Sequence, residues 1–209
     1  YLSNPDNPMG TWWSAAQIER FIAAVPEETL ILLDEAYCET APPDTLPALD
    51  IARRNLIRTR TFSKAYGLAG MRVGYAIGEA DFIKAFDKVR NHFGVTRLSQ
   101  VAAMAALADQ DWLARVVAQV AAGRERIYAI AADSGLSAVR SATNFVAVDC
   151  GRDGDYALGV LRALEARGVF VRKPTAPGLD RHIRISVGRP EELDVVAAEL
   201  PLALRDAAG

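Results

Sequence analysis

Cysteine and histidine are scarce in this sequence of 209 residues, which contains two of each. Cys38 and Cys150 are too few for a disulfide framework or a cysteine-based metal centre, and their scarcity fits a reducing compartment. His92 and His182 are likewise too few for a histidine-rich metal centre. We therefore expect no metal site.

The sequence also lacks a surplus of positive charge and any long apolar run. Its 24 basic and 26 acidic residues give a formal net charge of −2. A broad basic surface for nucleic acid or for an anionic membrane is therefore not expected. No apolar stretch approaches the roughly 20 residues that span a bilayer. These absences favour a small-molecule partner.

The first part of the chain contains alternating helical and strand patterns. Apolar residues at helical spacing, preceded by Ser14 as a candidate N-cap, predict a helix over residues 14 to 25. Pro26 ends that pattern. Apolar runs then predict strands over 30–33, 55–62 and 72–78, with the glycine-containing loop KAYGLAG between the last two. This alternation predicts an α/β layer with a mainly parallel sheet.

The second part of the chain has a different pattern. Residues 80 to 132 are almost entirely helical in pattern, with breaks near 91–96 and 109–111. The remaining pattern predicts a compact α+β unit of strands at 144–149, 169–172 and 182–187, a helix at 156–167, and a helix after Pro190. We place a domain change near residue 110, which divides the chain into domains of residues 1–110 and 111–209.

Two motifs in the first part of the chain carry polar side chains. The turn NPDNPMG, residues 4 to 10, can hold Asn7 at a fixed position, although it can equally be a structural turn. Asp34 and Tyr37 follow the first long strand. A carboxylate at the carboxyl end of a parallel strand faces the crevice where ligands bind in open sheets. The alternative for Asp34 is a cap of the next turn.

A third motif is TRTFSKAYGLAGMRVGY, residues 59 to 75, which places one lysine among small and apolar residues. The amine of Lys64 is suited to imine formation with an aldehyde, although a solvated loop lysine is the alternative. The hydroxyls of Thr61 and Ser63 suit a phosphate, and the Arg72 guanidinium matches phosphate oxygens bidentately. Gly74 indicates a close approach of the backbone to another group. Such a combination is not expected by accident.

At these residues the sequence resembles the class I/II aminotransferases of fold type I, which depend on pyridoxal phosphate. Within that family it is most similar to the histidinol-phosphate aminotransferase branch. The resemblance covers nearly the whole chain, through the motifs NPDNPMG, LDEAY at 33–37, SKAYGLAGMRVGY at 63–75, TNFV at 143–146, VFVR at 169–172 and RISVG at 184–188. It implies the aspartate aminotransferase-like fold, with residues 1–110 as the last part of a large cofactor-binding domain and 111–209 as a small α+β domain.

The resemblance also implies roles for individual residues. Lys64 would form an imine with the cofactor aldehyde and then act as the general base. Asp34 would pair with the pyridinium nitrogen, and Tyr37 and Asn7 would donate hydrogen bonds to the phenolate oxygen. Thr61, Ser63 and Arg72 would hold the phosphate.

Three further residues are implied in substrate binding. Arg184 matches the arginine that binds the substrate α-carboxylate, although a solvated strand arginine, on one face with His182 and Ser186, is the alternative from pattern alone. Arg172 matches an arginine that helps to bind the substrate phosphate in the histidinol-phosphate branch. Asn144 matches a polar position near the substrate and the cofactor.

The resemblance implies a cytoplasmic homodimer with shared active sites, exchanging an amino group between an amino acid or amino-alcohol phosphate and a 2-oxo acid. The stretch NHFGVTRLSQ, residues 91–100, departs from the Pro-Phe-Asn-Val-Asn pattern of the branch. Aromatic amino acid aminotransferases, threonine-phosphate decarboxylases and aminotransferase-like effector domains therefore remain alternatives. Several family site residues precede the Asn-Pro turn, so we expect an N-terminal part ahead of Tyr1.

Overall fold

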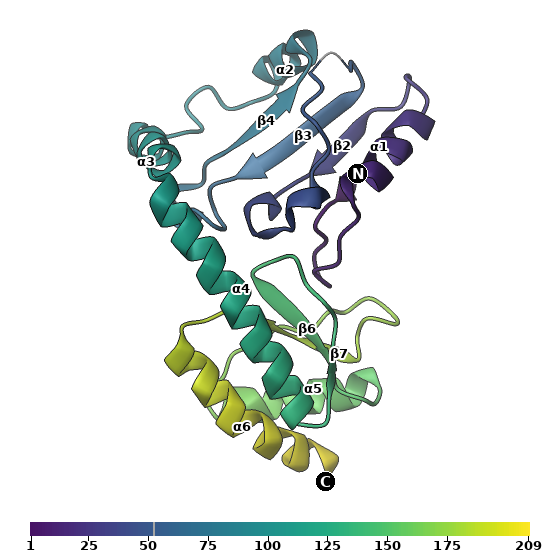
Figure 1. The fold of residues 1–209 in the computed structure, drawn as a ribbon, viewed down its shortest axis with the longest axis vertical. Helices are drawn as coiled ribbons and strands as arrows, with labels where there is room; N and C mark the ends of the chain where they lie inside the picture. Colours follow the sequence, from purple (N-terminus) through teal and green to yellow (C-terminus); the bar gives the residue numbers. More distant parts are fainter. Residues whose placement is uncertain (52) are drawn as a thin grey trace. The chain divides into compact units, whose positions relative to one another are not determined.

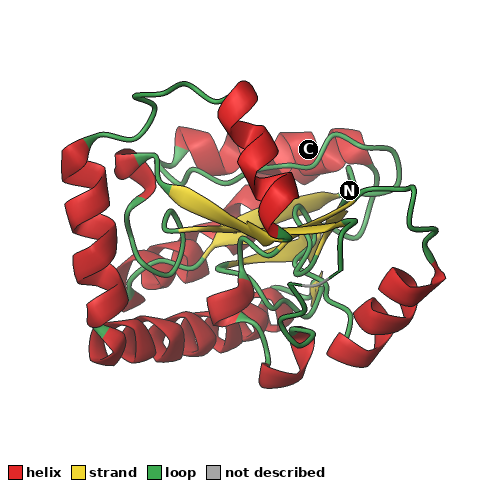
Figure 2. Cartoon of the chain, turned by 90° about the horizontal axis from the view of Figure 1, so that it is seen from above, coloured by secondary structure: helices red, strands yellow, loops and turns green. Residues whose placement is uncertain are grey.

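A computed structural model describes residues 1–51 and 53–209 of the chain. The described residues form two compact units (Figure 1). Unit 1 comprises Tyr1–Pro5 and Trp12–Val117, and unit 2 comprises Asp6–Thr11 and Ala118–Gly209. Helices and strands are mixed throughout the chain, as in an α/β protein (Figure 2).

Unit 1 contains a four-stranded sheet of order β1-β2-β3-β4. Its strands are β1 (Leu2–Ser3), β2 (Ile31–Asp34), β3 (Leu56–Thr61) and β4 (Gly74–Gly78). The first three pair in parallel, and β4 pairs antiparallel with β3. The mainly parallel sheet is confirmed. The edge strand β4 is antiparallel because a loop without a crossover helix connects it to β3.

The helices of unit 1 are α1 (Ala15–Ala24), α2 (Ala80–Ala85) and α3 (Arg97–Ala108), with 3-10 turns at Cys38–Thr40, Pro43–Thr45, Ala69–Met71 and Phe86–Lys88. The predicted cap Ser14 accepts a hydrogen bond from the Gln17 backbone and forms a capping box. Ile18 and Ile22 of α1 then pack against apolar side chains of β2 and β3. The helical spacing in the sequence therefore identified Ile18 and Ile22 as buried, whereas Phe21, which shares that spacing, is 44% exposed.

Helix α4 (Gln110–Asp133) belongs to both units, because the division between them falls at Val117 and Ala118. The breaks predicted in this helical stretch are present, since α3 ends at Ala108 and residues 91–96 form a loop. We propose that residues 1–110 and 111–209 correspond to the last part of a large domain and to a small domain. Helix α4 itself begins at the predicted domain change.

Unit 2 contains a three-stranded antiparallel sheet of order β5-β6-β7 and two long helices. The strands are β5 (Ser137–Ala138), β6 (Phe145–Asp149) and β7 (His182–Ser186), and the helices are α5 (Gly154–Ala166) and α6 (Pro190–Ala208). Both helices and α4 contribute to one apolar core with β6 and β7. Val146, Val148 and Ile183 are fully buried in it.

The strand predicted over residues 169–172 is wrong. Only Arg172 pairs there, in an isolated antiparallel bridge with Arg184. The backbone N–H of Val169 instead donates to the Leu164 carbonyl and closes the end of α5, so this residue is not free for a sheet ladder. Among the described helices, none combines the length and the apolar character that a bilayer span requires.

Candidate active site

Asp34 is the last residue of β2, at the carboxyl end of a parallel strand. Its Oδ1 accepts a hydrogen bond from the Ala36 backbone at 3.0 Å, and its Oδ2 accepts one from the Tyr1 hydroxyl at 2.6 Å. Its carbonyl accepts from the Asn4 backbone at 2.9 Å. Asp34 therefore caps the following turn and also lies at the edge where open sheets bind ligands.

Lys64 lies beside Tyr37 at the same edge of the sheet. Tyr37 follows β2 and is only 4% exposed, whereas Lys64 follows β3 and is half-buried. The Lys64 Nζ lies 5.1 Å from the centroid of the Tyr37 ring, within the range of a cation–π contact. The alternative of a fully solvated loop lysine does not describe this position.

The predicted phosphate-binding residues lie on β3 and on the loop that follows it. Thr61 ends β3, and its Oγ1 accepts a hydrogen bond from the Ser63 backbone at 3.1 Å. Arg72 is exposed and has a left-handed backbone with φ of 50°. Its guanidinium donates to the Ala69 carbonyl at 2.8 Å, which uses one of five N–H donors. The Thr61 hydroxyl and the Arg72 guanidinium are therefore placed by local turns.

Gly74 allows two strands to approach each other closely and is not explained by contact with a ligand. A Cβ at this position would lie 2.7 Å from the carbonyl oxygen of Arg60. The close approach inferred from the sequence is therefore the pairing of β4 with β3, because any larger residue would push these two strands apart.

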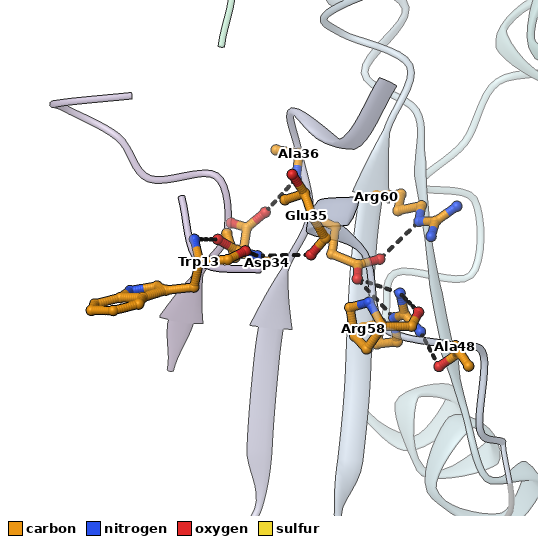
Figure 3. Close-up of polar contacts among 10 residues, drawn as sticks. Trp13, Asp34, Glu35, Ala36, Ala48, Arg58 and Arg60 are labelled. Atoms are coloured by element: carbon orange, nitrogen blue, oxygen red, sulfur yellow. Dashed lines mark hydrogen bonds and ion pairs between the residues drawn. The ribbon is translucent and has the colours of Figure 1, made fainter. Parts of the chain in front are cut away.

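A buried ionic cluster of Glu35, Arg58 and Arg60 lies beside Asp34, and the sequence did not reveal it (Figure 3). Glu35 is fully buried, and its two carboxylate oxygens accept from the two arginines. Burial alone would lower the pKa of Arg60, but its hydrogen bond to Glu35 raises that pKa above its ordinary value. Two arginines on a buried strand could have indicated a buried carboxylate partner.

The two cysteines are poor candidates for nucleophilic chemistry. Burial raises the pKa of the Cys38 thiol well above its ordinary value, and the neighbouring Glu39 carboxylate adds to this effect. Burial likewise raises the pKa of Cys150 to about 11. Within the residues that the structure describes, no group of His, Cys, Asp and Glu side chains is arranged to hold a metal ion.

Four predicted site residues belong to unit 2. Arg184 on β7 is half-buried, its guanidinium carbon lies 4.6 Å from the Phe145 ring centroid, and its Nη1 donates to the Asn7 Oδ1 at 2.5 Å. The backbone N–H of Arg172 donates to the Arg184 carbonyl at 3.1 Å. Asn144 accepts from the Val187 backbone at 2.9 Å. Unit 2 therefore brings Asn7, Arg172 and Arg184 together, and Arg184 is not a simple solvated residue.

The polar groups of unit 1 form a donor and acceptor set of mixed character. One amine, one carboxylate, one phenol, two hydroxyls and one guanidinium lie at or after the ends of β2 and β3. Such a set suits a ligand that has an aldehyde, a protonated ring nitrogen and a phosphate, because each ligand group has a chemical complement. Pyridoxal phosphate has all three.

A family model described as "Aminotransferase class I and II" matches residues 1–200. The chain belongs to this family. Histidinol-phosphate aminotransferase 2 of Pseudomonas aeruginosa is 45% identical to this chain over 197 residues. The match covers 93% of this chain and 53% of that relative. The chain thus spans about half the length of the curated relatives it matches.

Solved aminotransferase structures support the fold. A histidinol-phosphate aminotransferase from Sinorhizobium meliloti, crystallised in complex with pyridoxal-5′-phosphate, is 53% identical with a TM-score of 0.95. The match covers 98% of this chain and 57% of that one. An aspartate aminotransferase from Thermus thermophilus is 23% identical with a TM-score of 0.78, covering 97% of this chain and 59% of that one. The aspartate aminotransferase-like fold predicted from the sequence is confirmed.

Proposed function

We propose that this chain belongs to a pyridoxal-phosphate-dependent aminotransferase that transfers an amino group between histidinol phosphate, or a similar amino-alcohol phosphate, and a 2-oxo acid. The observation that carries this proposal is the placement of Lys64 beside the Tyr37 ring, at the sheet edge where Asp34 ends β2. The substrate class follows the names of the relatives at 40–45% identity.

The cofactor would be held by its three polar groups. Asp34 would keep a proton on the ring nitrogen, Tyr37 and Asn7 would donate to the phenolate oxygen, and the phosphate would be held by Thr61, Ser63 and Arg72. When bound, pyridoxal phosphate supplies an aldehyde that captures an amine and a ring that accepts electrons from the α-carbon. Lys64 would anchor the aldehyde and move the proton at the substrate α-carbon.

The residues of unit 2 would bind the substrate. Arg184 would hold an α-carboxylate through its planar fork of donors, since the Phe145 ring and Asn7 already fix its direction. Its Nε is buried and has no hydrogen-bond partner among the described residues, which fits a donor that awaits a ligand. Arg172 and Asn144 would contribute to the substrate phosphate and to the polar lining of the site.

The assembly and the compartment belong to the same proposal. The family resemblance supports a homodimer with shared active sites. The two buried, unbridged thiols fit a cytoplasmic location, because that compartment is reducing. Sedimentation of the full-length enzyme would test the oligomeric state, and cell fractionation would test the compartment.

Replacement of the lysine tests the central part of the proposal. The full-length enzyme with pyridoxal phosphate should absorb visible light, and borohydride reduction should add the cofactor mass to the peptide that contains Lys64. In Lys64→Ala we expect neither effect, and a loss of transamination of at least about 10³-fold. Lys84→Ala is the matched control, because the Lys84 side chain is 74% exposed and pairs with Asp81 on the surface of α2.

The reaction itself is tested by half-reactions with a panel of amino donors. An aminotransferase should leave the amine form of the cofactor after one turnover with histidinol phosphate. Release of carbon dioxide with return of the aldehyde form would instead indicate a decarboxylase. Labelling of Lys64→Ala by borohydride at another lysine would contradict the assignment of Lys64.

A further inference from the structure

Glu35 is the most completely enclosed charged group of unit 1. Its side chain is 0% exposed, and Arg58, which faces it from β3, is 2% exposed. The Glu35 Oε1 accepts from the Arg58 Nε at 2.9 Å and also from its Nη2. The Oε2 accepts from the Arg60 Nε at 2.9 Å. Both carboxylate oxygens are therefore held by guanidinium groups of the neighbouring strand.

The backbone of Glu35 is held as firmly as its side chain. Its N–H donates to the Thr59 carbonyl at 2.9 Å, and its carbonyl accepts from the Cys38 backbone at 3.0 Å. Arg58 extends the cluster by donating to the carbonyls of Pro47 and Ala48. The cluster therefore ties the end of β2 to β3 and to the segment before β3.

Glu35 follows Asp34 directly, and consecutive residues of an extended strand direct their side chains to opposite faces. Figure 3 shows Glu35 extending toward Arg58 and Arg60, while the Asp34 carboxylate lies on the other side, near Ala36. A side chain that is locked on one face determines the direction of its neighbour on the other. Glu35 can thus set the position of Asp34 without touching any ligand of Asp34.

A buried ionic cluster is not needed for stability alone, because apolar side chains of similar volume stabilise a protein interior equally well or better. Its directional bonds instead select one arrangement of the strand ends. This selection matters most where a functional carboxylate must be held within a few tenths of an ångström. The placement of the cluster beside Asp34, rather than at the other end of these strands, satisfies that condition.

We propose that Glu35, clamped by Arg58 and Arg60, is a positioning residue that holds the Asp34 carboxylate in place for the nitrogen of the bound cofactor ring. This inference rests on the proposed function, since it requires that Asp34 contact that ring. Glu35 itself contacts neither cofactor nor substrate.

The test uses the full-length enzyme and the substitution Glu35→Gln, which keeps the shape of the side chain and removes its charge. Asn55→Ala is the matched control. Asn55 is 4% exposed at the opposite end of the same strands, where its amide donates to the carbonyls of Pro26 and Thr29 at 3.1 and 2.9 Å. Both substitutions remove buried polar contacts from the sheet, but only one of them is adjacent to Asp34.

The measurements are the unfolding temperature, pyridoxal phosphate affinity of the apoenzyme, visible spectrum, kcat and KM. For Glu35→Gln we expect about tenfold weaker cofactor binding. This is the lower end of the loss in affinity expected when a group that orients a ligand-binding residue is removed. We expect kcat to fall by about 100-fold, as misplacement of a catalytic group by about 1 Å does. The visible band should shift, and KM for the amino donor should change little. Asn55→Ala should lower the unfolding temperature and leave the other quantities unchanged.

Arg60→Gln is a milder variant for the case in which Glu35→Gln does not fold, because the Arg60 side chain is 18% exposed. It should shift the same quantities in the same direction and by less. Unchanged cofactor affinity and spectrum in both cluster variants, or equal changes in Asn55→Ala, would overturn the inference while the proposed function stands. A wild-type enzyme that does not bind pyridoxal phosphate would overturn both.

Discussion

The interiors of the two units differ in kind. In unit 2, α4, α5, α6 and the sheet surround one continuous cluster of sixteen buried residues, nearly all apolar. The main apolar cluster among the described residues of unit 1 has five, and the same unit encloses Asn4, Glu35 and Arg58. The difference shows that burial stabilises unit 2 through apolar surface, whereas unit 1 relies more on directional polar contacts.

The surfaces of the two units also differ. Within the described residues, most of the large exposed apolar side chains belong to unit 1, including Phe93, Met104 and Trp112. Unit 2 exposes Phe170 and Val195. The unit with the candidate cofactor residues therefore has both the more polar interior and the more apolar surface. The two units are thus stabilised by different kinds of contact, and the predictions below test that difference.

The largest expected effect on stability is in the core of unit 2. Leu164 of α5 is fully buried, so Leu164→Ala should lower the free energy of unfolding by about 2–5 kcal/mol. Hydrogen exchange measured by mass spectrometry on the full-length enzyme should show the loss in residues 118–209. Val195→Ala is the control, because Val195 is 49% exposed on α6. Equal effects of the two substitutions would contradict the apolar basis of unit 2.

A smaller effect is expected from the polar interior of unit 1. The side chain of Asn4 donates to the carbonyls of Trp13 and Thr45 and accepts from the Trp13 backbone at 2.8 Å. Asn4→Ala leaves these groups unpaired and should cost about 1–3 kcal/mol. Faster hydrogen exchange confined to unit 1 would confirm this. If exchange does not change, polar contacts do not stabilise unit 1.

The smallest effect concerns an ion pair of unit 2. Burial alone would raise the pKa of Asp149, but hydrogen bonds from the Gly151 backbone and Arg181 lower it below its ordinary value. A depressed pKa stabilises the folded state above the unfolded pKa, and that contribution is lost as the pH falls through the folded value. Asp149→Asn should therefore cost less than about 1 kcal/mol at neutral pH, because the pair is partly exposed.

The pH dependence distinguishes this small effect from a simple loss of packing. Chemical denaturation of wild type and Asp149→Asn should show a difference in stability at pH 7 that begins to decrease near pH 4, the ordinary pKa of an aspartate, and disappears only below the lowered pKa of the folded state. A difference that is constant down to pH 3 would show that the charge of Asp149 has no part in it.

Much of the fold followed from periodicity and turn residues. The helix after Ser14, the strands β2, β3, β6 and β7 and the break before Gln110 lie where the sequence predicted them. The direction of β4 was not specified, because an apolar run does not encode the direction of its partner. The two-residue strands β1 and β5 are too short for any period, and the apolar run at 169–172 is used to close α5.

The candidate site was accessible to sequence reasoning only in part. Lys64, Asp34 and Arg72 stand in motifs with turn residues, so their chemistry could be inferred, and their site roles stay predictions. Glu35 was not identified because a glutamate after a strand usually indicates a solvated end. Its burial depends on two arginines that β3 brings opposite it. Contacts between residues far apart in sequence arise from tertiary pairing, which no local pattern encodes.

The short segment Asp6–Thr11 has a consequence for the construction of chimaeras between related enzymes. Gly10 has a φ of +81°, and a Cβ there would lie 2.3 Å from the Ser141 Oγ. Its carbonyl accepts from the Ala142 backbone at 2.8 Å. Since this segment belongs to unit 2, an exchange of residues 118–209 alone separates pieces that fit each other. A recombinant with two exchange points, which transfers residues 6–11 together with 118–209, keeps the fit intact.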